Sequence, residues 1–558
     1  MSEGLSNATT LPAAGDAATP HVVRFEQRQR PLSPDSPAKQ LSICLVNPRF
    51  EPSYWGFDYA LPLYPGDKRC TMITGALPAV AGLVPAPHEV VLLDENVEDI
   101  DFDRLRRFDI VGVTGMNVQQ KRMREILLRL RELKIFTAVG GAYAAVNEPY
   151  FDGLCDVLFV GEAETTWPEF LEDFAAGRPT KKVYEQAERT DMTKVPKPRY
   201  DLLKVGRYAS GALQFSRGCP FLCEFCDIIV TFGRRPRTKR PEQIIEELED
   251  LRKAGFFSAF LVDDNFIGNK KAAKELLRLI VPWQEKNGYP LRLSTEASIN
   301  LADDQELLEL LYAANFRHVF IGIESPRMAS LKETRKVQNT QGDSMEAKVE
   351  RVQNAGIDVH AGFIVGFDND DKAIFEDQYQ FIQENGILLA MVGMLAAIHK
   401  TPLYARLKGE GRLVEDDPNC NIVPKQMTRE ELQRGYWDLV RRLYTPEAFF
   451  DRYFRVYRFP EYHRRRAAIS RRAGEGKLLP TLGYGLILLW TLGRALLKER
   501  AVWSVGKVYL RYFFKVNLKY RRDVVGFAQF MNRCVTHWHF YKFTRLSIEG
   551  KLRLFSTT

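Results

Sequence analysis

Three cysteines in one short stretch constrain this chain more than any other feature. They are Cys219, Cys223 and Cys226, in Ser-Arg-Gly-Cys-Pro-Phe-Leu-Cys-Glu-Phe-Cys-Asp, and the 558-residue chain has eight cysteines in all. Thiolates are the usual ligands of iron–sulfur clusters, and a short loop lets three of them converge on one face of a four-iron cubane. The fourth iron is then open to a ligand that is not protein. The motif therefore predicts a [4Fe–4S] cluster with one open coordination site.

Two other uses of cysteine fit the sequence less well. A structural zinc site needs four closed ligands, and no second Cys-x2-Cys or Cys/His pair stands near the loop. A disulfide framework is typical of small exported proteins, whereas this chain is long, shows no secretory signal and has its other cysteines scattered. We therefore expect a cytoplasmic protein in a reducing compartment.

The N-terminal part is predicted to be a tail followed by an α/β domain. Residues 1–40, rich in Ser, Ala, Pro and Thr, predict a disordered tail. Over residues 41–180, short apolar runs alternate with helical patterns, which predicts an open doubly wound (Rossmann-like) sheet. Such domains bind ligands at the carboxyl ends of their strands. The residues expected to bind a cofactor there are Asn47, Thr114, Gly115, Asn117, Gly140, Gly141, Gly161 and Glu162.

A second alternation of strands and helices predicts a partial parallel (β/α)6 barrel over residues 209–415. Residues 181–208, a proline-punctuated stretch, are predicted to be the linker before it. The cysteine loop follows the first barrel strand, at the end where sites of such folds lie. Acidic or small residues also end barrel strands for solvation or turns, so their order counts for more than any one of them. The strand-end candidates are Asp263, Asp264, Asn265, Glu296, Ser298, Glu324, Gly362, Ile364 and Gly366.

The motif and these strand ends resemble the radical S-adenosylmethionine (SAM) enzymes, in which the open iron chelates SAM. The resemblance implies that the three cysteines hold the cluster and that Phe225 lies beside the SAM adenine. It places Asp263, Asp264 and Asn265 at the SAM amino group and Glu296 and Ser298 at its ribose or carboxylate. Glu324 ends a further strand at this site, and Gly362-x-Ile364-x-Gly366 resembles the strand that packs against adenine.

The resemblance narrows to the cobalamin-binding subgroup that includes the hopanoid C-2 methylases, and it covers nearly the whole chain after residue 40. Its N-terminal half is similar to a cobalamin-binding domain, best at Gly140-Gly141 and Gly161–Glu164. His88 is the only histidine between residues 41 and 201 and lies outside any Asp-x-His-x-x-Gly loop, so cobalt should lack a histidine lower ligand. The chain departs from the subgroup at Tyr64–Cys70, where a proline-rich loop is expected. A flavodoxin-like domain without a ligand is the alternative.

Residues 416–558 are predicted to form a helical, basic C-terminal domain. From residue 452 onward there are 23 Lys or Arg against 5 Asp or Glu, whereas the whole chain has a formal charge of +8. Nucleic acid, an anionic membrane surface, or a simple helical cap with solvated arginines would each account for this composition. The apolar run from Leu478 to Leu497 favours the cap or the membrane and argues against nucleic acid as a partner, because nucleic-acid binding needs no apolar face.

The first functional hypothesis is a cobalamin-dependent radical SAM methyltransferase that acts on an unactivated carbon of a polycyclic or isoprenoid lipid. Such a carbon has no acidic proton and no lone pair, so cofactors supply the chemistry. The alternatives are a cobalamin-binding radical SAM enzyme that cyclises or rearranges its substrate without methyl transfer, and a non-catalytic cobalamin or iron–sulfur sensor. A methylthiotransferase acting on tRNA should carry extra cluster cysteines, but Cys44, Cys70 and Cys155 are scattered.

The expected partners are a small-molecule or lipid substrate and an electron donor such as flavodoxin or ferredoxin. A peripheral contact with the inner face of the membrane, through the C-terminal region, is the further expectation for a lipid substrate.

Overall fold

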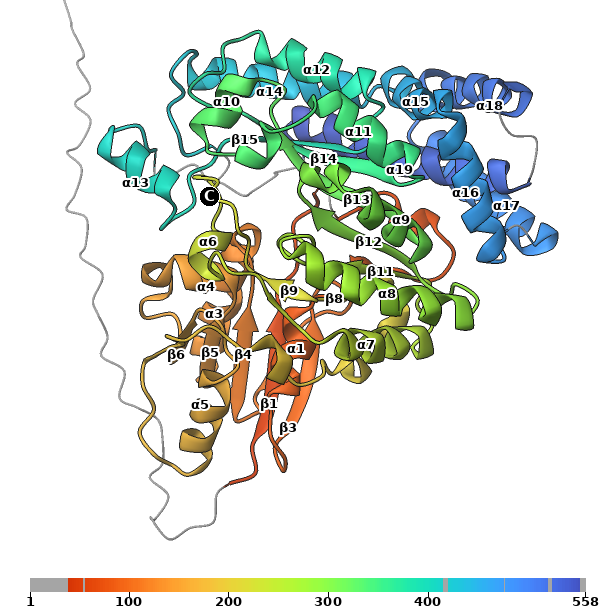
Figure 1. The fold of residues 1–558 in the computed structure, drawn as a ribbon. Helices are drawn as coiled ribbons and strands as arrows, with labels where there is room; N and C mark the ends of the chain where they lie inside the picture. Colours follow the sequence, from red (N-terminus) through yellow and green to blue (C-terminus); the bar gives the residue numbers. More distant parts are fainter. Residues whose placement is uncertain (1–38, 54–55, 415–419, 476, 520–523, 552–558) are drawn as a thin grey trace, which may run out of the picture.

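The computed structural model describes residues 39–53, 56–414, 420–475, 477–519 and 524–551. The tail predicted over 1–40 lies almost wholly outside these residues. The described chain contains two large parallel sheets, a short antiparallel pair of β9 (Ser216–Arg217) and β10 (Arg237–Thr238), and a helical C-terminal region (Figure 1). The predicted fold class is confirmed: a doubly wound sheet, then a curled parallel sheet, then helices.

The N-terminal sheet has six parallel strands in the order β3-β1-β4-β5-β6-β7. The order reverses between β1 and β4, and this is the point where doubly wound sheets bind ligands. Residues 181–208, predicted to be a linker, contain β7, which extends the sheet. The strands are β1 (Ser42–Asn47), β3 (Glu89–Asp94), β4 (Ile110–Thr114), β5 (Thr137–Gly140), β6 (Val157–Val160) and β7 (Val183–Glu185).

The second sheet has seven parallel strands in the order β15-β14-β13-β12-β11-β8-β2. Six of them are the predicted barrel strands. The seventh, β2 (Cys70–Met72), comes from the N-terminal part and pairs with β8, so Cys70 lies opposite Tyr208. The barrel strands are β8 (Tyr208–Leu213), β11 (Ser258–Leu261), β12 (Arg292–Ala297), β13 (Phe316–Glu324), β14 (Asp358–Val365) and β15 (Ala390–Met394).

Burial alternates along β13 and β14, because successive side chains of a strand point to opposite faces. Val319 and Ile321 are fully buried on the face that the helices cover, whereas His318, Gly322 and Gly362 keep accessible surface on the other, inner face. Figure 1 shows the covering helices around the curled sheet. They are α7 (Pro241–Lys253), α8 (Lys270–Lys286), α9 (Gln305–Ala313), α11 (Met345–Asn354) and α12 (Ile374–Glu384).

The C-terminal region is helical, as predicted. Its long elements are α14 (Arg429–Leu443), α15 (Pro446–Arg455), α16 (Pro460–Arg472), α17 (Leu478–Lys498), α18 (Lys507–Lys519) and α19 (Val524–Ile548).

Helix α19 contacts residues that adjoin both edge strands of the curled sheet. Its Phe540 stacks on Tyr444 with ring centroids 4.4 Å apart, and Tyr444 Oη donates a 2.7 Å hydrogen bond to the carbonyl of Ala390 in β15. Phe540 also contacts Phe57, with centroids 5.7 Å apart, in the segment that leads to β2. Within the described residues β15 and β2 do not pair with each other. Helix α19 therefore closes the side that the sheet leaves open.

Candidate active site at the cysteine loop

Two aspartates that follow β11 hold the start of the cysteine loop. Asp263 is buried, and its carboxylate accepts hydrogen bonds from Phe215 N (2.7 Å), Ser216 N (3.0 Å) and Ser216 Oγ (2.7 Å). Asp264 Oδ2 accepts a 2.7 Å hydrogen bond from Gly218 N. Both carboxylates thus fix the backbone that leads into the cysteines, which is a positioning role that the sequence did not reveal.

Gly218 permits the tight entry into the loop. Its φ of +94° lies in the left-handed region, and a Cβ there would lie 2.9 Å from the carbonyl oxygen of Arg235 and 3.0 Å from that of Gly233. The next residue, Cys219, donates its amide to the same Gly233 carbonyl at 3.2 Å. A side chain at residue 218 would therefore push the first cysteine out of place.

The three predicted cluster cysteines are free thiols that lie close enough to influence one another. Cys223 is buried, and the other two are half-buried. Burial raises the pKa of Cys226 to about 12, with smaller contributions from Asp227, Cys223 and Cys219. Amide groups point at two of the sulfurs: Asn265 Nδ2 lies 3.8 Å from Cys219 Sγ and Gln338 Nε2 lies 3.6 Å from Cys223 Sγ.

This donor set fits an iron–sulfur cluster. Burial raises the pKa of Cys219 and of Cys226, so a strong positive centre such as bound iron would favour their thiolate forms. Amide N–H groups directed at cysteine sulfur are typical of cluster sites, where they tune the reduction potential.

A buried ion pair lies beside the loop. Lys336 Nζ pairs with Glu324 Oε1, and both side chains are 10% exposed. The ammonium lies 5.8 Å from the centroid of the Phe225 ring, the aromatic residue between the last two cysteines. Glu324 itself has a φ of +64°, an uncommon backbone conformation for a residue other than glycine. The predicted cofactor residue Glu324 is therefore already paired, and Lys336 was missed because no short-range pattern links it to the loop.

The predicted residues Asn265, Glu296 and Ser298 lie near Asp263 and Asp264. Asn265 Nδ2 donates to Ser298 Oγ (3.1 Å), and Asn265 Oδ1 accepts from Ser298 N (3.2 Å). Burial, with Asp264 and Asp263 nearby, raises the pKa of Glu296 to about 7. Three acidic side chains thus share one edge of the site, where a cationic group would stabilise them.

The predicted adenine-binding strand is β14. Gly362 and Ile364 keep accessible surface on its inner face. Gly366, just after the strand, has a φ of +107°, and its amide donates a 3.0 Å hydrogen bond to Asp370 Oδ2. Asp370 is fully buried and also accepts from Phe367 N at 3.0 Å, so it shapes this strand end. Sequence reasoning missed Asp370 because the residue lies beyond the strand that it supports.

In the N-terminal sheet, the predicted residues line the carboxyl edge around the reversal of strand order. Asn47 is buried, donates to Asp94 Oδ1 and accepts from Gln119 Nε2, each at 3.0 Å. Asn117 is exposed, and its Oδ1 accepts a 3.3 Å hydrogen bond from Gln120. Their assignment to cobalamin stays a prediction.

The glycines at the carboxyl edge of the N-terminal sheet either allow close packing between strand ends or leave open space beside the chain. A Cβ on Gly141 would lie 2.4 Å from Thr114 Oγ1 and 3.0 Å from Gly115 N, so this glycine lets the ends of β4 and β5 pack closely. A Cβ on Gly140 would lie 3.3 Å from Phe159 Cβ. Gly161, with a φ of +83°, has only one atom within 4 Å of such a Cβ, so the space beside it is open.

Glu162 joins the two halves of the molecule. Its carboxylate, 1% exposed, lies 3.0 Å from Arg217 Nη1 and 3.0 Å from Arg237 Nη1, and it accepts a 2.9 Å hydrogen bond from Thr190 N. Arg217 also pairs with Glu164 at 2.6 Å. The carboxyl edge of the first sheet is therefore bonded to the residues that flank the cysteine loop, and Glu162 lies at this junction with its oxygens occupied.

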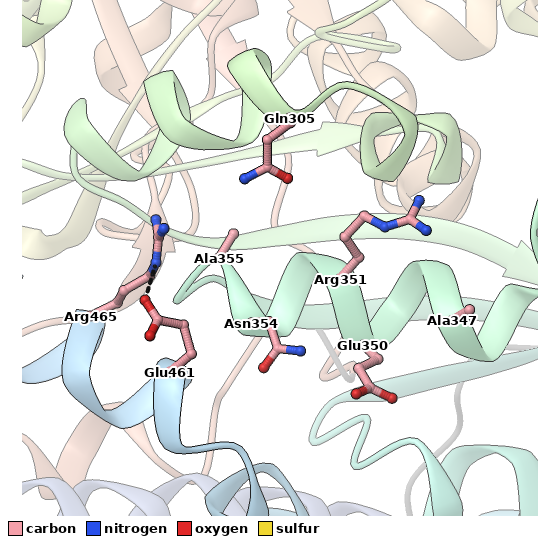
Figure 2. Close-up of a pocket in the computed structure, with 8 residues that line it drawn as sticks. All are labelled: Gln305, Ala347, Glu350, Arg351, Asn354, Ala355, Glu461 and Arg465. Carbon is pink, nitrogen blue, oxygen red and sulfur yellow. Dashed lines mark hydrogen bonds and ion pairs between the residues drawn. The ribbon is translucent and has the colours of Figure 1, made fainter.

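A separate pocket of about 390 Å³ lies on the outer, helical side, between α9, α11 and α16 (Figure 2). Arg465 in its wall is paired with Glu461 and with Glu309, at 2.9 Å and 2.7 Å. The pocket contains neither the cysteines nor the strand ends, so it is not the predicted site. Its lining residues are Gln305, Ala347, Glu350, Arg351, Asn354, Ala355, Glu461 and Arg465.

Comparison with known proteins agrees with this geometry. Residues 213–382 match the model of the radical SAM superfamily, and residues 401–551 match a domain of unknown function, DUF4070. The chain is 37% identical over 415 residues to the hopanoid C-2 methylase of Rhodopseudomonas palustris, covering 74% of this chain and 78% of that protein. The chain belongs to the radical SAM family that includes the hopanoid C-2 methylases.

Other similarities extend this result. An uncharacterized methyltransferase of Synechocystis is 38% identical to this chain over 422 residues. The match again covers 74% of this chain and 78% of the relative. The solved structure of the cobalamin-dependent SAM radical enzyme OxsB, with aqua-cobalamin and SAM bound, is 17% identical. It superposes with a TM-score of 0.57 and covers 92% of this chain and 81% of OxsB. At that identity the likeness shows a shared fold.

Proposed function

We propose that this radical SAM methyltransferase uses cobalamin and methylates an unactivated carbon of a polycyclic or isoprenoid lipid. The observation that carries the proposal is the junction at Glu162, which bonds the carboxyl edge of a doubly wound sheet to the cysteine loop. Two cofactors bound at those two places would meet at one substrate. The relationship to a hopanoid C-2 methylase supports a lipid, and the fold shared with OxsB supports cobalamin over residues 41–180.

The residues have distinct tasks in this proposal. Cys219, Cys223 and Cys226 hold the cluster, which with SAM supplies hydrogen abstraction while methylcobalamin supplies the methyl group. Asp264 and Glu296 would face the ammonium of bound SAM, because this acidic edge offers the negative charge that such a group needs. Asp263 and Gly218 set the backbone of the loop. The accessible inner face near Gly362 and Ile364 receives the adenine.

Exclusion of water is the second task of the protein. Helix α19 covers the open side of the curled sheet with aromatic side chains, so the inner face is walled on the side where β15 and β2 do not pair. A reactive carbon centre lasts only where solvent and stray hydrogen donors are kept away. The DUF4070 region, which contains α19, is therefore part of the proposed active site.

We further propose a flavodoxin or ferredoxin as electron donor, and a cytoplasmic protein that contacts the inner face of the membrane peripherally. A lipid substrate supports the membrane contact, because such a molecule resides in the bilayer.

Anaerobic reconstitution with iron, sulfide, hydroxocobalamin and SAM tests this function. Under a strong reductant, mass spectrometry should detect both 5′-deoxyadenosine and S-adenosylhomocysteine, and cobalamin should stay bound through gel filtration. The Cys223→Ala variant should retain cobalamin and form no 5′-deoxyadenosine. Deoxyadenosine without bound cobalamin would contradict methyl transfer and favour a rearrangement, whereas bound cofactors without any SAM cleavage would favour a sensor.

A further inference from the structure

Helix α17 presents a broad apolar face to solvent. Large apolar side chains recur there at helical spacing of three, four and seven residues, so they share one side of the helix. We call this set the α17 face: Leu479 (79% exposed), Leu482 (37%), Leu486 (49%), Trp490 (66%) and Leu497 (70%). Monomeric soluble proteins rarely leave such a contiguous apolar stripe in water.

The opposite side of α17 is fixed to the protein. Leu488, Leu492 and Leu496 are buried, and a Cβ on Gly485 would lie 2.5 Å from the Phe527 ring of α19. Thr491 Oγ1 donates a 2.8 Å hydrogen bond to the carbonyl of Leu63. Among the described residues, α17 is the one helix that is long and apolar enough to cross a membrane. A helix bound along one side to a folded domain, however, offers lipid only its other side.

The charge around the α17 face is positive. Residues 477–500, which contain α17 and its two flanks, have four Lys or Arg, all exposed, and one Glu. The single acid, Glu499, is already paired with Lys542 at 2.7 Å and with Arg545 at 3.0 Å. The guanidinium of Arg494 lies 5.7 Å from the Trp490 ring centroid, at the border of the apolar stripe. Just beyond the helix, Trp503 is 83% exposed.

We propose that the α17 face binds the surface of an anionic lipid bilayer, with α17 lying in the plane of the interface. Apolar side chains on one side, tryptophan at the boundary and an excess of Lys and Arg are the features of interfacial helices. A second copy would match the apolar stripe but would bring like charges together. This inference deepens the proposed function, and it rests on that proposal for the substrate being a lipid.

The position of α17 places the proposed membrane contact next to the elements that close the curled sheet. Its fixed side packs on α19 and on the turn at Leu61–Leu63, the same helix and segment that close the curled sheet. The chain then runs from Tyr64 to β2, the edge strand of that sheet. A bilayer on the α17 face would therefore lie beside the wall of the proposed active site, which brings the membrane that holds a lipid substrate next to the enzyme's site.

Vesicle flotation with the full-length chain tests the proposal. The probes are vesicles of phosphatidylcholine alone and of phosphatidylcholine with phosphatidylglycerol, each at low and high salt. The protein should float with the anionic vesicles, and the bound fraction should fall as salt rises. The variant L479Q/L486Q/W490Q should partition at least tenfold more weakly. A matched control, V183Q/F257Q/M328Q, alters exposed apolar side chains outside the C-terminal region and should bind like the wild type.

Each result decides one way. Circular dichroism should show that both triple variants fold like the wild type, since all six residues are exposed. Equal binding by both triple variants would overturn the proposal. The proposal would also be overturned if the wild type is a dimer that binds no vesicles and the L479Q/L486Q/W490Q variant is a monomer. In that case a second copy of the chain would cover the α17 face. Flotation needs no turnover, so vesicle binding by a protein that fails to cleave SAM would refute the proposed function while supporting this inference.

Discussion

Replacement of Glu162 by glutamine should cost more stability than almost any other single charge removal in the N-terminal sheet. The carboxylate is 1% exposed, and the two arginines that face it, Arg217 and Arg237, are 13% and 14% exposed. Removal of one partner from a buried ion pair costs about 3–5 kcal/mol when the remaining charge stays buried without compensation, which applies to Arg237, whereas Arg217 keeps Glu164 at 2.6 Å. Glutamine keeps one acceptor oxygen, so we expect the low end, about 3 kcal/mol, or a factor of about a hundred in the unfolding equilibrium.

Urea denaturation of the cofactor-free protein at neutral pH, followed by circular dichroism, measures this loss. Glu172→Gln is the matched control, because Glu172 pairs with Arg178 on the surface of the same domain and is 79% exposed. Such exposed pairs contribute little, so the control should unfold like the wild type. If Glu162→Gln unfolds at the same urea concentration as the control, the junction does not hold the two halves together and the reasoning fails.

Three further predictions concern the loop and its surroundings. Lys336→Met should lower the midpoint potential of the reconstituted cluster, because the substitution removes a buried positive charge beside the thiolates. The potential would be measured by EPR-monitored redox titration. An unchanged potential would show that Lys336 has no electrostatic role. Gly218→Ala should bind much less iron, by colorimetric assay, since its Cβ would lie 2.9 Å from a backbone oxygen; full iron content would mean that the loop adapts. Glu296→Gln should be more stable than the wild type at pH 8 but not at pH 5. The folded-state pKa of about 7 lies above the ordinary value of 4.5, so the wild type loses stability as pH rises through 7; a constant difference in denaturation midpoint would contradict this.

The sequence alone predicts the features that local patterns encode. The spacing of Cys219, Cys223 and Cys226 identifies the loop, and apolar runs separated by helical periods locate the six barrel strands. Helices with a clear period, such as α3 (Gln120–Glu132) and α7, form within the two stretches where helical patterns alternate with apolar runs. These elements depend on neighbours in the chain, so their signals are short-range.

Contacts between residues that are far apart in the sequence cannot be predicted from local patterns. Strand β2 has only three residues and becomes a strand by bonding to β8, more than 130 positions further along. The ion pairs that Glu162 makes with two arginines of the other half could not be predicted from its place after a strand, and its expected contact with cobalamin stays a prediction. The Lys336–Glu324 pair and the closure by α19 likewise arise only when the sheet curls. Local periodicity carries no information about such contacts.

Transfer of a labelled methyl group tests the central claim most directly. The reconstituted protein would be incubated anaerobically with a reductant, methyl-deuterated SAM and a polycyclic triterpenoid in anionic vesicles, and the extracted lipid would be analysed by mass spectrometry. The account predicts a lipid product in which a deuterated methyl group replaces hydrogen, absent with Cys223→Ala. Repeated formation of 5′-deoxyadenosine with a lipid that is altered but carries no label would contradict methyl transfer and assign the site to a rearrangement.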